Sequence, residues 1–223
     1  MPKRKSKKIF QYLFLFLIIG TLNNKNLSTF ELPKIDEIVV SGLSKKENSE
    51  VLKSLEKFKE NNLFFLSKFE LVKIIEKNDY IEKFSVSKKY PSSLNIHLQK
   101  TRLMALINKD AKFFYIGSNR KFIEASKQAK NLPFIYGEFD IDKFFEIKED
   151  IDQSNFKLSQ VKNLFFFPSG RWDIETHKGI LIRLPIFKVK ESLNLYLELL
   201  NKDDFKDIKI IDLRQNNQVI TNE

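Results

Sequence analysis

The chain has 223 residues, with 39 Lys and Arg against 29 Asp and Glu, two His and no Cys. That length suits one or two domains with buried cores. The absence of Cys excludes disulfide frameworks, thiolate metal centres and thiol nucleophiles, and two His make a His-based metal centre or a Ser-His-Asp triad hard to assemble. A hydrophobic content of 42%, including 22 Phe, is typical of a folding chain.

The formal net charge of +10 is concentrated at the N-terminus. Lys and Arg occupy five of the six positions from 3 to 8, and the remaining cations exceed the acidic residues only modestly and are scattered among them. A nucleic-acid-binding surface would gather its cations in a stripe with stacking aromatic residues. We therefore expect no nucleic-acid partner.

An apolar run, Ile9–Leu22, follows this basic cluster. Positive residues ahead of such a run orient its N-terminus toward the cytoplasm. Its fourteen residues span about 21 Å as a helix, short of a hydrocarbon core near 30 Å, so a retained anchor and a cleaved signal peptide are both open. No Ala-x-Ala-like cleavage site follows, which favours an anchor. We predict a cytoplasmic tail over 1–8 and a transmembrane anchor over 9–29, with the bulk of the chain outside the cytoplasm.

Residues 33–102 contain an ordered series of secondary-structure signals. A β-branched run ends at a Ser-Gly turn, two Ser-x-x-Glu capping boxes each open a helix, and two further strands flank a Tyr-Pro turn. The predicted elements are a strand at 35–40, helices that begin after Ser44 and after Ser67, and strands at 81–89 and 94–98. The order is β-α-α-β-β, in which two helices can cover one face of a three-stranded sheet.

Residues 103–223 are expected to form an antiparallel β-rich domain with flanking helices. Alternation predicts that Trp172, Ile174 and Thr176 share one face of a hairpin strand. Helices are expected over 140–152 and from Val189 to Leu200, and the Phe165–Phe167 run is expected to belong to the core. Further strands are expected at 208–214 and, at the edge of the sheet, at 218–222.

Several of these motifs resemble known families. The β-α-α-β-β order, Gly42 after the first strand, the Asn62–Leu66 stretch and the Tyr90-Pro91 turn resemble a POTRA domain. A basic tail, one anchor and a single POTRA domain resemble the FtsQ/DivIB family of division proteins. Trp172 before an alternating hairpin, a strand ending in Leu-Pro, and Asp-Leu-Arg at 212–214 are similar to that family's C-terminal domain. The resemblance implies an α+β fold made of an anchor helix, a POTRA domain and a β domain.

The resemblance also implies a function. Members of this family are non-catalytic scaffolds of the inner membrane that link early and late division proteins at the septum. The β domain would bind FtsB- and FtsL-type single-pass coiled-coil proteins by strand addition at the C-terminal edge, and the POTRA domain would contact other division proteins. By position, Arg214 would take an acidic residue of the partner, with Gln215, Asn217 and Val219 lining the same edge.

Two other functions and an enzymatic role are the alternatives to this one. A POTRA-containing factor for outer-membrane protein assembly would need a barrel or further repeats, and a secreted soluble binding protein would need a cleaved N-terminal run. Ser-x-x-Lys occurs five times, but neither Ser-Asp-Asn nor Lys-Thr-Gly completes a serine hydrolase site, and there is no Gly-rich phosphate loop. We therefore expect no enzyme, no cofactor, no metal and no small-molecule substrate.

Overall fold

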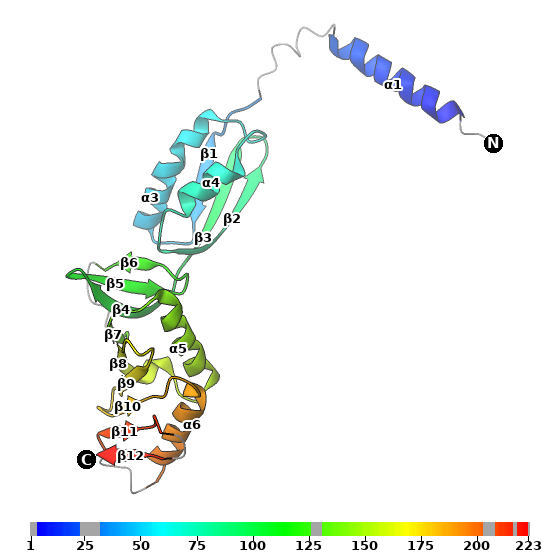
Figure 1. Ribbon diagram of the computed structural model, residues 1–223. Coiled ribbons are helices and arrows are strands. Elements are labelled where there is room, and N and C mark those ends of the chain that lie inside the picture. The colour runs from blue at the N-terminus through cyan, green and yellow to red at the C-terminus, as the bar shows by residue number, and fades with distance from the viewer. Residues whose placement is uncertain (1–3, 23–31, 126–130, 203–207, 216–217, 223) are drawn as a thin grey trace.

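Helix α1 (Arg4–Leu22) stands apart from two folded units that follow it (Figure 1). The computed structural model describes residues 4–22, 32–125, 131–202, 208–215 and 218–222. Of the predicted anchor, residues 9–22 lie in α1 and residues 23–29 lie outside the described residues. Within the described ranges, no helix combines the length and the apolar character needed to cross a bilayer.

The first folded unit, residues 32–100, is called the POTRA unit below. Its sheet has the order β1-β3-β2, in which β1 runs parallel to β3 and β2 runs antiparallel to it. Two α-helices and a short 3-10 helix lie on one face of this sheet (Figure 1). The elements are β1 (Glu37–Ser41), α3 (Lys45–Leu55), η1 (Glu56–Glu60), α4 (Lys68–Ile75), β2 (Ile81–Lys89) and β3 (Ser93–Lys100). The predicted β-α-α-β-β order is confirmed.

Local sequence signals explain where the two helices of the POTRA unit begin. The Ser44 hydroxyl accepts a hydrogen bond from the Glu47 backbone N–H, and the Glu47 side chain accepts one from the Ser44 backbone N–H, which completes a capping box. At α4, Ser67 accepts a hydrogen bond from the Glu70 backbone N–H. Both caps fix the helices so that their apolar faces meet β1 and β3 in a core that includes Leu55.

Gly42 is required where the chain leaves β1. Its φ is +103°, and a Cβ built on it would lie 1.8 Å from the Leu98 carbonyl oxygen of β3. Only glycine combines this backbone conformation with so close an approach of two strands. The turn from β1 into α3 therefore packs tightly against the sheet.

The second folded unit, called the C-terminal unit, is built on a nine-stranded sheet with the order β12-β11-β10-β9-β8-β7-β4-β5-β6. Most neighbouring strands are antiparallel, and the β10–β11, β4–β7 and β7–β8 pairs are parallel. The strands are β4 (Leu103–Lys109), β5 (Lys112–Gly117), β6 (Phe122–Glu124), β7 (Phe134–Tyr136), β8 (Val161–Phe166), β9 (Trp172–Thr176), β10 (Leu181–Arg183), β11 (Ile210–Asp212) and β12 (Ile220–Asn222). The α+β class with flanking helices is confirmed.

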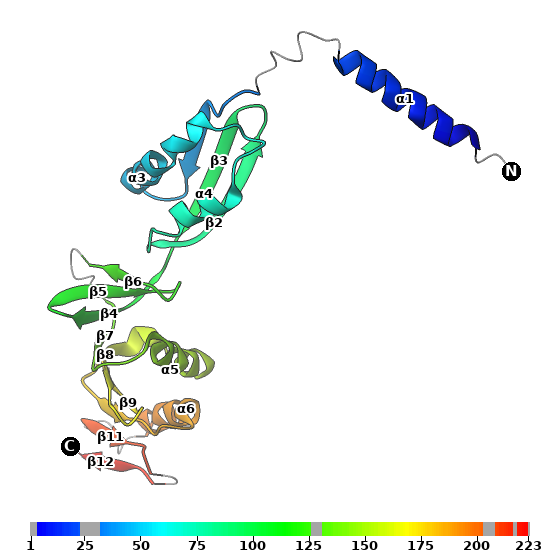
Figure 2. The ribbon, with the colours of Figure 1, turned by 45° about the horizontal axis from the view of Figure 1, so that its top comes forward.

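Helices α5 (Ile141–Gln153) and α6 (Val189–Leu200) both pack on one face of this sheet, as Figure 2 shows. Their buried side chains meet Trp172, Ile174 and the other core-facing residues of the strands. The opposite face of the sheet carries no helix among the described residues. This one-sided cover leaves a broad sheet face open.

The expectation that Phe165–Phe167 belongs to the core is wrong for two of its three residues. All three are partly buried, but only Phe166 packs against the core, whereas Phe165 and Phe167 line a surface pocket with Arg171 and Arg183. Side chains of a strand alternate between its two faces, so three consecutive Phe cannot all face the same side.

The two units meet at a polar junction. The Glu82 carboxylate of β2 accepts hydrogen bonds from the Thr101 hydroxyl, at 2.8 Å, and from the Ser118 hydroxyl of the C-terminal unit. The Asn119 side-chain amide donates to two backbone carbonyls of the POTRA unit at 2.7 and 3.0 Å. Strand β3 also leads into β4 through only two residues. These contacts fix one unit against the other.

Candidate partner-binding edge

Strand β12 is the last strand of the nine-stranded sheet. It pairs antiparallel with β11, and no described strand pairs with its other side. Its three residues, Ile220–Asn222, are all exposed. The predicted edge strand at 218–222 is therefore present, with its regular part limited to 220–222. An edge of this kind offers unpaired backbone N–H and C=O groups to an added strand.

Arg214 lies just after β11 and is held by Asp212. Its Nε donates to both carboxylate oxygens, at 2.8 and 2.9 Å, its Nη2 donates to Oδ2, and its backbone N–H donates to Oδ1 at 3.1 Å. These side-chain hydrogen bonds hold the pKa of the Asp212 carboxyl below its ordinary range. The guanidinium is thus fixed in position inside its own chain, while its side chain stays 38% exposed.

Two further arginines and a second carboxylate stand beside this pair. Arg171 donates through Nε to Asp173 at 3.1 Å, and an Nη1 atom of Arg183 lies 3.8 Å from Asp212. Burial raises the pKa of the Asp173 carboxyl, and the charge of Arg171 opposes that shift. Both carboxylates are buried and the arginines are not, so the surface of this cluster presents mainly guanidinium groups.

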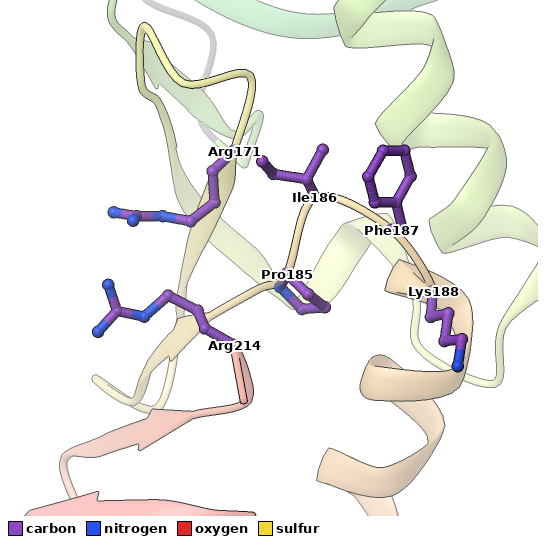
Figure 3. A pocket seen from close by; sticks show the side chains of 6 residues that line it. All are labelled: Arg171, Pro185, Ile186, Phe187, Lys188 and Arg214. Atoms are coloured by element: carbon purple, nitrogen blue, oxygen red, sulfur yellow. The ribbon is translucent and has the colours of Figure 1, made fainter. Parts of the chain in front are cut away.

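A pocket joins Arg171 and Arg214, and we call it the arginine pocket. Figure 3 shows both guanidinium groups extending toward the same side, with Pro185, Ile186 and Phe187 on the other side. The pocket is lined by Arg171, Pro185, Ile186, Phe187, Lys188 and Arg214. It combines positive charge with exposed apolar side chains, a combination that suits an acidic residue set within an apolar segment.

The open face of the sheet continues from this pocket as a series of aromatic contacts. The Arg171 guanidinium lies 4.3 Å from the centre of the Phe167 ring, a cation–π contact. Phe165 stacks on Tyr136, with ring centres 5.1 Å apart and planes 11° apart, and Tyr136 in turn contacts Phe134. The arginines therefore stand at one end of an aromatic surface that crosses β7 and β8.

The predicted site residues differ in where the structure places them. Arg214 and Gln215 are exposed beside the arginine pocket and before β12. Val219 is half-buried and packs against the core, so its side chain supports β12 from within. Asn217 lies outside the described residues. The role of these residues in binding stays a prediction.

Sequence reasoning did not single out Arg171, Arg183 or Asp212 as site residues. Alternation alone places Arg171 and Asp173 on the face opposite Trp172. Their meeting with Arg183 and Asp212 depends on the register of β9, β10 and β11, in which Asp173, Arg183 and Asp212 stand side by side. No local pattern in the sequence specifies that register.

The chain is similar to known division proteins over most of its length. A family model described as POTRA domain, FtsQ-type, matches residues 34–100, and one described as cell division protein FtsQ/DivIB, C-terminal, matches residues 96–214. Cell division protein DivIB of Clostridium tetani is 31% identical over 132 residues, which are 59% of this chain and 49% of that protein. DivIB of Clostridium botulinum is 24% identical over 227 residues, covering 93% of this chain and 86% of that protein.

Among solved structures, the major extracytoplasmic domain of the division protein DivIB from Geobacillus stearothermophilus aligns with a TM-score of 0.37 at 16% identity. The alignment covers 50% of this chain and 99% of the Geobacillus stearothermophilus chain. The chain spans about half the length of the Clostridium tetani relative and most of the Clostridium botulinum relative. Because the C-terminal family model alone covers more than half of the sequence, the chain belongs to the FtsQ/DivIB family of cell division proteins.

Proposed function

We propose that this protein is a non-catalytic scaffold of the division machinery at the septum. Residues 9–29 anchor it in the inner membrane, with the basic tail in the cytoplasm and both folded units in the periplasm. The C-terminal unit binds single-pass coiled-coil proteins of the FtsB and FtsL type, and the POTRA unit contacts other division proteins. Family membership and the basic cluster ahead of an apolar run support this proposal.

The observation that carries the proposal is an unpaired strand edge on β12 in the sheet whose next strand, β11, leads into Arg214 of the arginine pocket. Strand addition to β12 would supply backbone hydrogen bonds without demanding a particular partner sequence. The arginine pocket of the same sheet would add selectivity, because a carboxylate on the partner can bind guanidinium groups that already have fixed positions.

Arg214 can serve its own chain and a partner at once. A guanidinium has five N–H donors. Asp212 takes those of Nε and Nη2, so the Nη1 side is left for a second carboxylate. Arg171 is arranged in the same way, since Asp173 takes its Nε. The internal carboxylates thus orient the arginines and reduce the entropy lost when a partner binds.

The test is co-purification from gently solubilised membranes with an affinity tag at the N-terminus, which leaves β12 unaltered. We expect small single-pass coiled-coil proteins to be recovered with the wild-type chain and to be lost with Arg214→Glu. Arg120→Glu is the matched control, because Arg120 also pairs with an aspartate, Asp142, on a different part of the C-terminal unit. Equal recovery with all three chains would contradict the role of Arg214.

The same preparation tests the anchor. A chain of full length in the membrane fraction, resistant to extraction by high salt, is the expected result. A shortened chain in the soluble periplasm would show that residues 9–22 belong to a signal peptide; because cleavage would remove the N-terminal tag, the chain is detected in each fraction with an antibody against the C-terminal unit. An outer-membrane barrel as the main companion would assign the protein to outer-membrane assembly instead.

A further inference from the structure

One end of the POTRA unit exposes four aromatic side chains, which we call the aromatic tip. They come from the loop before α4, from the first turn of α4, and from the turn between β2 and β3. Phe64, Phe65, Phe69 and Tyr90 are 56%, 81%, 75% and 56% exposed. Several exposed aromatic groups at one end of a folded unit are uncommon on soluble surfaces and mark sites of interaction.

The structure holds these side chains outward. Leu63 and Leu66 on either side of the Phe pair are buried in the core, so the two Phe between them project away from it. The Asn62 side chain accepts a hydrogen bond from the Phe64 N–H and donates one to the Pro33 carbonyl, both at 2.8 Å. The Phe64 ring also contacts the Tyr90 ring, with centres 4.8 Å apart. The tip is therefore a built surface rather than a loose loop.

The aromatic tip lies at the end of the POTRA unit where the chain arrives from α1. Lys34 pairs with Asn62 in a β-bridge, and the Ile35 N–H donates to the Asn61 carbonyl at 3.0 Å. The C-terminal unit joins the opposite end, where β3 leads into β4 (Figures 1 and 2). Residues 23–33 separate α1 from this end, and so few residues reach at most about 40 Å.

Lysines alternate with the residues of the aromatic tip along the sequence, with Glu70 as the acidic residue in the first turn of α4. Lys68 lies between Phe65 and Phe69 in sequence, and Lys88 and Lys89 precede Tyr90. The Lys88 ammonium donates to the Leu63 carbonyl, and no acidic side chain within the described residues forms an ion pair with Lys68 or Lys89. Exposed aromatic rings with lysines as sequence neighbours suit a bilayer surface with anionic headgroups, where the rings reach the acyl boundary and the lysines meet phosphates.

We propose that the aromatic tip docks the POTRA unit onto the surface of a bilayer that contains anionic lipids. This contact goes beyond the proposed scaffold role. It depends on that role only for the orientation of the tip toward the membrane that α1 is proposed to enter. The tip would hold one end of the POTRA unit against the membrane. The strands of its sheet would then lead away from the bilayer, and the C-terminal unit would be held away from the lipid.

The test uses a fragment of residues 32–223, which lacks α1. Among the described residues, both hydrophobic cores are built from residues that follow position 34 and none comes from α1, so this fragment keeps the packed elements that the structure describes. The fragment is sedimented with phosphatidylcholine vesicles, with and without phosphatidylglycerol. We expect binding to the anionic vesicles, weaker binding at high salt, and a loss of about tenfold in partitioning for Phe65→Ser, the factor that 1.4 kcal/mol produces.

Phe187→Ser is the matched control, because Phe187 is also 81% exposed but lies in the arginine pocket of the other unit. It should leave vesicle binding unchanged. Failure of the wild-type fragment to bind, or an equal loss with both substitutions, would overturn the proposal. Concentration-dependent dimerisation that Phe65→Ser abolishes would also overturn it and assign the tip to a second copy of the chain. The fragment retains β12 and Arg214, so none of these outcomes bears on the scaffold function.

Discussion

The two sheets of this protein expose different kinds of residues on their open faces. In the POTRA unit, the side chains that point away from the helices are mostly polar, such as Ser85 on β2 and Asn95 and His97 on β3, with Val39 on β1 as an apolar exception. In the C-terminal unit, the same outward positions carry Tyr136 and Phe165. Both sheets bury one face under helices, yet only one open face has an aromatic surface with arginines at its end.

This difference shows that alternation alone does not define a solvent face. A strand whose outward positions are polar leaves no further apolar area to bury once helices cover its other face. A strand whose outward positions are aromatic leaves apolar area in water, which favours burial by another molecule. The open face of the POTRA sheet is therefore the internal reference for each test of the C-terminal sheet.

The largest expected effect is a difference in the free energy of unfolding between substitutions on the two faces of β8. Leu164 is fully buried in the core, and Leu164→Ala should lower the free energy of unfolding by about 2–5 kcal/mol. Phe165→Ala removes a ring stacked on Tyr136 at the open face, and should cost only about 0.5–1.5 kcal/mol. Urea unfolding of both variants measures this. Similar losses would mean that Phe165 belongs to the core after all.

Asp212→Asn should have the next largest effect. The carboxylate is buried beneath Arg214 and Arg183, and weakening its charge-assisted hydrogen bonds should cost about 1–3 kcal/mol at neutral pH. Because its folded-state pKa is lowered, the wild-type carboxylate contributes stability above the unfolded-state pKa near 4, and that contribution is lost as the pH falls through the lower folded-state value. Wild type should therefore lose stability below pH 4 more steeply than the variant does, as measured by urea midpoints across that range.

Asp173 should respond to pH with the opposite sign. Its folded-state pKa is raised, so its ionisation opposes folding at neutral pH, and that penalty disappears as the pH falls below the unfolded-state value. On acidification, Asp173 should add stability to wild type, and Asp173→Asn should abolish that gain. Asp212 should cost wild type stability on acidification, and Asp212→Asn should abolish that loss. The same sign of change in both variants would contradict the arrangement described for the arginine cluster.

Ending the chain after Val219 should have a small effect on stability and a large one on binding. The three residues of β12 are exposed, so their loss should cost about 1 kcal/mol or less. Val219 stays in place against the core. Co-purification should fall strongly, because the edge that we propose for strand addition is gone. Undiminished recovery with a stable fold would place the partner elsewhere on the sheet.

The smallest expected effect comes from the POTRA sheet. Asn95→Lys changes an outward position of β3, and the free energy of unfolding should change by no more than about 0.5 kcal/mol. Recovery of coiled-coil partners should not change. A strong loss of a different division protein on this substitution would reveal that the polar face is also a binding surface.

Local signals predicted the POTRA unit well because short-range sequence patterns determine where its elements begin and end. The Ser44 cap and the strict alternation before Gln99 need no distant information, and the structure contains both features. The helix expected at 140–152 is also present, as α5. Such elements follow from neighbours in sequence.

The candidate site could be predicted only in part. The Asp-Leu-Arg motif pointed to Arg214, and the turn before Gln218 pointed to a last strand at the edge. The internal partner of Arg214 and the contribution of Arg171 were missed, because β10 pairs parallel with β11 across a long connection while it pairs antiparallel with β9. Cross-strand neighbours of this kind depend on tertiary register, which no local pattern specifies.

The junction between the two units has a mechanical consequence. Glu82 and Asn119 tie β2 to the loop after β5, so the two units cannot bend freely about the short connection at Thr101. A scaffold with such a joint acts as a spacer of fixed length. If the aromatic tip rests on a membrane as proposed, β12 would stand at one height above that membrane, and a partner too short or too long to reach that height would not pair with it.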